Sequence, residues 1–85
     1  MKPHKVLEKI LRGSRNVRFA DMQGLVKAFG FTLSRVSGSH RIFTHPNVPE
    51  LVNLQEVSGQ AKPYQIRQFL KLVEEYNLKL EGDEP

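Results

Sequence analysis

The chain has 85 residues, no cysteine and a formal charge of +4. This length predicts one small domain and excludes two-domain enzymes and large cofactor-binding folds. The lack of cysteine excludes disulfide frameworks, cysteine-based zinc sites and thiol nucleophiles. No apolar run approaches the roughly 20 residues of a membrane-spanning helix, and residues 1–7 do not form the apolar stretch of a signal peptide. We therefore expect a cytoplasmic protein without a membrane partner.

The charge is unevenly distributed along the chain. Residues 1–73 contain 12 basic and 4 acidic residues, whereas residues 74–85 contain five acids beside Lys79. A basic surface attracts polyanions because binding releases condensed counterions. The first part of the chain is thus a candidate nucleic-acid surface, although many small domains of similar charge bind no nucleic acid.

Helical periodicity appears three times along the chain. A short amphipathic helix is predicted over residues 5–12 and stops at Gly13. A second helix carries apolar residues from Phe19 to Phe29 and ends at Gly30, which suits the left-handed position past a helix end. A third begins at Pro63, and its apolar face is formed by Ile66, Phe69, Leu70 and Val73.

Between the second and third helices the apolar period falls to two. Residues 31–36 and 40–45 read as a hairpin around the turn-prone residues 37–39, and residues 50–57 read as a third strand after a connection at 47–49. Residues 58–60 are expected to form a loop. Residues 78–81 form a short strand or a docked coil, and residues 82–85 are expected to be disordered.

This order predicts an α+β fold with a three-stranded antiparallel sheet and amphipathic helices packed on one face. The opposite face stays open, is partly polar, and is bordered by Arg35 and Arg41. It is the face we expect to meet a partner.

Histidine is the most plausible catalytic group on a small scaffold without cysteine, because its unperturbed pKa lies near neutral pH. His4 is expected at the solvated surface, and His45, before Pro46, has either a loop-closing or a chemical role. His40 follows the turn Ser37–Gly38–Ser39 and precedes Arg41, so an imidazole adjoins backbone donors and a guanidinium, the groups that phosphodiester cleavage needs. The alternative is a hairpin turn followed by an ordinary strand residue.

No metal site and no cofactor are predicted. His40 and His45 would point to opposite faces of one regular strand, so they cannot easily share an ion. Phosphate-cradling glycine loops and nucleophile elbows are also absent from the sequence. Because accessible aromatic residues are scarce, RNA would be bound through backbone and shape rather than by base stacking.

Three segments together resemble the HicA (YcfA-like) toxin family. They are the strand Gly30–Val36, the run Gly-Ser-His-Arg-Ile-Phe-Thr-His-Pro over residues 38–46, and the helix opening Ala-Lys-Pro-Tyr from Ala61. The resemblance covers about residues 18–77. The chain departs from the family where a second histidine often follows the first, here Arg41, and where a Pro-x-His segment often ends the third strand, here Leu54–Val57 with Glu56.

The resemblance implies a fold like that of double-stranded-RNA-binding domains, cleavage of mRNA, and neutralisation by a HicB-type antitoxin. It implies that His40 is catalytic and that Gly38 and Ser39 form the turn that presents it. Residues 1–17 are then a helical extension, residues 18–80 the HicA-like domain, and residues 81–85 an acidic tail. Arg41 and the backbone N–H groups of Gly38 and Ser39 are the candidates for supporting the phosphate in the transition state. The candidates for binding the RNA backbone are Arg18, Lys27, Arg35 and Lys62.

Two other functions are compatible with the sequence. The first is an RNA-binding module, similar to double-stranded-RNA-binding domains, that does not cleave. The second is a protein-interaction domain whose basic face binds an acidic protein. Salt-dependent RNA affinity would argue against the second, and the effect of His40→Ala separates the enzyme from the binder.

Overall fold

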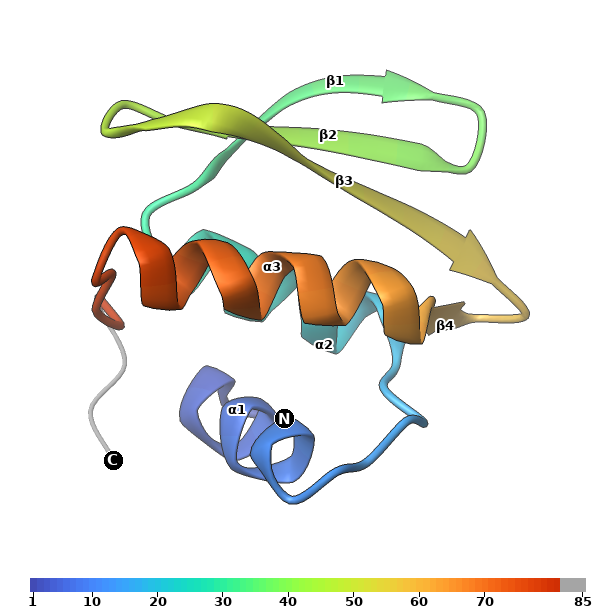
Figure 1. The fold of residues 1–85 in the computed structure, drawn as a ribbon. Coiled ribbons are helices and arrows are strands. Elements are labelled where there is room, and N and C mark those ends of the chain that lie inside the picture. The colour runs from blue at the N-terminus through green and yellow to red at the C-terminus, as the bar shows by residue number, and fades with distance from the viewer. Residues whose placement is uncertain (82–85) are drawn as a thin grey trace.

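The computed structural model describes residues 1–81 (Figure 1). Its class is α+β, as predicted, but the antiparallel sheet has four strands rather than three, in the order β1-β2-β3-β4. In chain order the elements are α1 (Pro3–Leu11), α2 (Phe19–Ala28), β1 (Thr32–Ser37), β2 (His40–His45), β3 (Val48–Val57), β4 (Gln60–Ala61) and α3 (Pro63–Glu75).

The three helices end in the same way. After α1, α2 and α3 the chain takes a positive φ at Gly13, Gly30 and Asn77. At the end of α2, the Gly30 N–H donates to the Lys27 carbonyl and the Phe31 N–H donates to the Val26 carbonyl. This pattern is the Schellman motif, which satisfies carbonyl groups left over at a helix end. The two glycine stops predicted from the sequence are therefore confirmed.

Gly30 also lies where no side chain fits. A Cβ atom at this position would be 2.9 Å from Nε2 of His45 and 2.7 Å from Oε2 of Glu81. Gly30 thus combines a left-handed backbone with close contact from two other segments, and both features demand glycine.

Two predictions about the strands were wrong. They concern the start of β3 and the residues that follow its C-terminal end. β3 begins at Val48, whereas the sequence predicted a connection through Pro49 and a strand from residue 50. The predicted loop at 58–60 is a tight turn, in which Ser58 and Gly59 both have positive φ, followed by the short strand β4. Two positive φ angles in a two-residue turn define the type I′ hairpin, whose twist matches paired strands.

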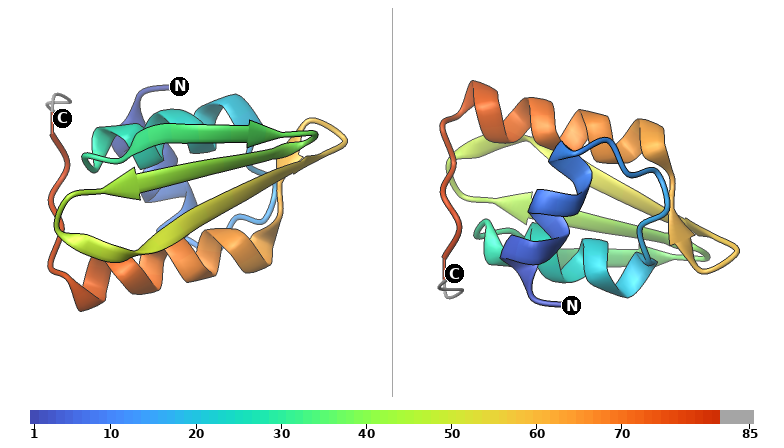
Figure 2. Two further views of the ribbon diagram at one scale, coloured as in Figure 1. Left: turned by 90° about the horizontal axis from the view of Figure 1, so that it is seen from above. Right: turned by 90° about the horizontal axis from the view of Figure 1, so that it is seen from below.

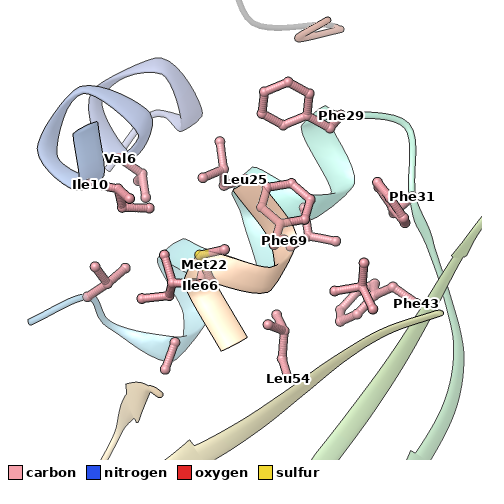
Figure 3. Close-up of a cluster of buried hydrophobic side chains, with 14 of the residues drawn as sticks. Val6, Ile10, Met22, Leu25, Phe29, Phe31, Phe43, Leu54, Ile66 and Phe69 are labelled. Carbon is pink, nitrogen blue, oxygen red and sulfur yellow. The ribbon is translucent and has the colours of Figure 1, made fainter. Parts of the chain in front are cut away.

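The molecule has three layers (Figures 1 and 2). The sheet forms one layer, α2 and α3 lie side by side beneath it, and α1 crosses beneath those two helices. The core lies mainly between the sheet and the α2–α3 layer, where Phe43, Leu54, Met22 and Phe69 are at most 1% exposed (Figure 3).

The predicted N-terminal helix therefore does not cover the sheet. Val6 and Ile10, one turn apart on α1, are buried against the outer side of the helical layer (Figure 3). Burying two such side chains contributes roughly 1.5–3 kcal/mol each. α1 thus leaves the other face of the sheet uncovered.

The segment after α3 is a coil, which settles the choice between a tail strand and a docked coil. Leu78 and Leu80 pack against the core, and the Glu81 N–H donates to the Ala28 carbonyl at 2.6 Å. The predicted disorder of residues 82–85 concerns residues outside the described part of the chain. Within residues 1–81, the model contains no helix with the length and apolarity needed to cross a membrane.

One long edge of the sheet is open. Within residues 1–81, β1 pairs only with β2, and all six of its residues are exposed. Its register shifts between Leu33 and Arg35, so Ser34 forms a bulge. The opposite edge is closed in part, because Gln65 of α3 accepts a hydrogen bond from the Gln55 N–H at 2.6 Å.

Candidate active site

A two-residue turn presents His40 at the start of β2. Ser37 pairs with His40, which leaves Gly38 and Ser39 as the turn residues. Gly38 has a φ of +58°, while Ser39 does not have a positive φ, as in a type II′ turn. The Ser39 carbonyl accepts a hydrogen bond from the Glu56 N–H, which ties the turn to β3. The turn expected from Gly-Ser-His is therefore present, and both of its residues are exposed.

The His40 side chain lies on the open face of the sheet. In β2, Phe43 is completely buried against the helices, and successive strand residues point to opposite faces. His40 therefore belongs to the other face, together with its partner Gln55 in β3. This face is where a large ligand can reach the imidazole without displacing a helix.

Asn53 orients the imidazole. Its Oδ1 lies 3.1 Å from His40 Nδ1, and both residues lie on the open face. Because a carbonyl oxygen can only accept, this contact requires a hydrogen on Nδ1, and the neutral tautomer that provides it has its lone pair on Nε2. In this arrangement Asn53 fixes the orientation of the imidazole, with Nε2 directed away from Asn53.

Sequence analysis did not single out Asn53. The alternation of β3 does place Asn53 and Gln55 on the polar face, but many strands have such residues. Which of them meets His40 depends on the β2–β3 register, and that register pairs His40 with Gln55 and brings Asn53 to the diagonal position.

The Arg41 side chain lies on the opposite face from the His40 ring. Its guanidinium carbon is 5.9 Å from the centre of the Phe19 ring, and Nη1 donates to the Gly38 carbonyl at 3.0 Å and to the His40 carbonyl at 3.5 Å. Adjacent strand residues diverge in this way. Arg41 thus braces the turn from the helix side, and the structure does not bring its guanidinium to the His40 ring.

His45 closes the β2–β3 turn. Its Nδ1 accepts a hydrogen bond from the Asn47 N–H at 3.0 Å, and its ring packs edge-on against Phe31 at 4.9 Å. The side chain is only 9% exposed, on the face opposite His40, as expected for two histidines five residues apart in a strand. Within residues 1–81, no group of three or more histidine, aspartate or glutamate side chains is placed to hold a metal ion.

The four cationic residues predicted to bind the RNA backbone are all exposed but do not form one cluster. Arg35 lies on β1 and pairs with Ile42, which places it on the His40 face. Arg18 and Lys62 both lie beside β4. The backbone of Arg18 forms an isolated antiparallel β-bridge with Gln60, and Lys62 follows β4 directly as the N-cap of α3. Lys27 lies at the other end of α2. Arg18 and Lys62 are thus brought together near the turn end of the molecule, and Lys27 is not.

The fold and the site define a small α+β protein with an oriented histidine on an open, partly basic sheet face. A model of the family described as the HicA toxin of bacterial toxin-antitoxin systems matches residues 19–74. The chain belongs to this HicA toxin family, and the resemblance seen in the sequence is confirmed. The match includes His40 and Asn53 but not α1. Comparison with curated proteins and with solved structures finds no match.

Proposed function

We propose that this protein is an endoribonuclease toxin that cleaves mRNA with His40 and without a metal ion. The observation that supports it is the His40–Asn53 hydrogen bond on the open face, which leaves a basic nitrogen directed away from Asn53. Membership of the HicA toxin family supports the same activity. The proposal includes an RNA-binding mode like that of double-stranded-RNA-binding domains, supported by a sheet whose helices cover only one face.

In this mechanism Nε2 of His40 removes the proton of a ribose 2′-hydroxyl. The 2′-oxygen attacks the adjacent phosphorus, and the bond from phosphorus to the next nucleotide's 5′-oxygen breaks. The imidazolium returns the proton to that oxygen, so the products are a 2′,3′-cyclic phosphate and a 5′-hydroxyl. No water takes part in the step, and DNA, which has no 2′-hydroxyl, would be bound but not cut.

The charge that develops on the phosphorus oxygens needs donors. The exposed turn Gly38–Ser39 adjoins His40 and is our candidate for this role. Arg41 would contribute by holding that turn through the Gly38 carbonyl. Arg35, on the same face as His40, would bind the RNA backbone.

Membership of a toxin–antitoxin family implies an antitoxin partner. The partner we propose is a HicB-type protein whose acidic surface covers the His40 face. α1 lies beyond the helical layer, so it would not obstruct such a partner (Figure 2). Inhibition would then follow from exclusion of RNA from the open face.

One observation favours an RNA-binding module without activity as the second candidate. Within the described residues, His40 is the histidine on the open face, because His45 is buried and His4 belongs to α1. Arg41, where the family often has a second histidine, points to the helix side. A single imidazole must then act as both base and acid, which limits the rate.

Incubation of the partner-free protein with a long mRNA in EDTA tests the proposal, beside His40→Ala and with circular dichroism as the folding check. Cleavage by the native chain alone is the expected result. If neither protein cuts the RNA while both are folded and bind it, the enzyme proposal fails and the binding module replaces it. DNA of the same sequence should be bound and remain intact.

A further inference from the structure

The turn end of the molecule contains a second cationic site, separate from His40. The β1–β2 turn, the β3–β4 turn and the N-terminal ends of α2 and α3 meet at this end (Figures 1 and 2). An open cavity of about 540 Å³ lies there, on the helix side of the sheet. It is lined by Arg18, Arg41 and Glu56, with Phe19, Gln23 and the Ser58–Gly59 turn among the remaining walls.

The charges in this cavity are not neutralised by one another. Within residues 1–81, neither Arg18 nor Glu56 has a side-chain hydrogen bond or an ion pair. Arg41 donates only to the backbone carbonyls of Gly38 and His40, which leaves other guanidinium N–H groups unused. Among the described residues, two guanidinium groups and one carboxylate thus line this cavity, and no ion pair joins them.

Such a site fits an anion with several acceptor oxygens. Guanidinium groups bind phosphate through paired N–H donors, and a concave site strengthens the attraction because it removes part of the solvent. The acidic run at the end of α3, Glu74 and Glu75, lies at the far end of that helix. These two carboxylates therefore do not repel a polyanion bound at the turn end.

The cavity and His40 are close in the chain but face different sides of the sheet. Arg41 follows His40 directly, and its guanidinium bonds the turn that presents the imidazole. A strand of RNA whose reacting phosphate lies at His40 can pass over the exposed Gly38–Ser39 turn and reach the cavity. The chain thus offers two phosphate positions on opposite sides of one turn.

We propose that the cavity lined by Arg18 and Arg41 binds a backbone phosphate of the RNA substrate, flanking the phosphate that His40 acts on. This inference rests on the proposed function, since it takes RNA as the ligand. Glu56 opposes the bound phosphate and keeps this site weak.

The test is fluorescence anisotropy with a labelled RNA oligonucleotide in which every 2′-hydroxyl is methylated, so that binding is measured without cleavage. Affinity is measured from about 50 to about 200 mM salt. Arg18→Gln is expected to weaken binding severalfold and to lower the salt slope by about one, the loss of one phosphate contact. The Arg18 side chain is exposed, so the variant should fold normally.

Lys79→Gln is the matched control, because it removes one exposed positive charge in the coil after α3, outside the turn end. It should leave the salt slope unchanged. Glu56→Gln should tighten binding severalfold, because it removes the only carboxylate among the described residues that line the cavity.

Equal effects of Arg18→Gln and Lys79→Gln would overturn the proposal, as would unchanged or weaker binding by Glu56→Gln. A native chain whose RNA affinity does not depend on salt would also overturn it. That result would favour an acidic protein, rather than RNA, as the ligand of the cationic site. Failure of cleavage in EDTA, with the binding differences intact, would refute the proposed enzyme but leave this phosphate site.

Discussion

Asn53→Ala tests whether the hydrogen bond to His40 supports catalysis. The bond is 3.1 Å long and joins two side chains at the sheet surface. A hydrogen bond between two protein groups contributes about 0.5–1.5 kcal/mol of net free energy, because it replaces hydrogen bonds to water. If that energy orients the imidazole for proton transfer, its loss lowers the cleavage rate about 2- to 12-fold. Since Asn53 is exposed, the same bond should stabilise the fold only at the low end of this energy range, and the thermal midpoint should fall by about 4 °C or less.

The assay is single-turnover cleavage of RNA in EDTA with enzyme in excess, so that product release does not limit the rate. Gln55→Ala is the control: Gln55 lies on the same face, directly opposite His40, and within residues 1–81 its side chain forms no hydrogen bond. It should cleave within about twofold of the native rate. Equal losses in the two variants, or no loss in Asn53→Ala, would refute the orienting role.

Three further predictions concern the scaffold. Ile10→Ala should cost about 2 kcal/mol or more, a fall of roughly 10 °C in thermal midpoint by calorimetry, without reducing cleavage per folded molecule; a specific loss of activity would contradict the layer order. Gly30→Ala should destabilise more than Gly38→Ala in urea unfolding, because both have positive φ but only Gly30 would bring a Cβ within 3 Å of other side chains; equal losses would refute the packing argument. The Tyr76 hydroxyl donates to Glu50 at 2.6 Å, and this bond raises the pKa of Tyr76 from 10.0 to about 12. The folded state then holds the phenol proton more tightly than the unfolded state, so this stabilisation is present below pH 10 and is lost as the pH rises toward 12. Thermal midpoints across this range should fall less steeply for Glu50→Gln than for the native chain, and parallel curves would contradict the assignment.

The helices were predictable because their signals are local. Apolar spacing locates α2 and α3, and Gly13 and Gly30 mark the ends of the first two helices. The His40 turn was predictable for the same reason, since Gly38 and the alternation on either side lie within a few residues.

The features that escaped prediction depend on pairing between distant segments. Pro49 argued against a strand because it cannot donate to a sheet, yet β3 has no neighbouring strand on its outer side at that point. β4 has two residues, too few for a periodic signal. The His40–Asn53 contact requires the β2–β3 register, which shifts between Phe43 and His45.

The irregular outer edge of β1 has a consequence for self-association. A long, flat, unpaired edge adds strands from other chains and leads toward fibrils. Here the bulge at Ser34 interrupts the regular spacing of free backbone groups, and Arg35 would oppose its own copy in a symmetric antiparallel pair centred on it. Replacement of Arg35 by valine should therefore raise thioflavin T fluorescence on incubation, and an unchanged signal would assign the protection to the bulge. A strand that pairs with this edge must bend to follow the bulge at Ser34. The backbone shape of the edge therefore limits which chains can pair with it, whatever side chains they carry.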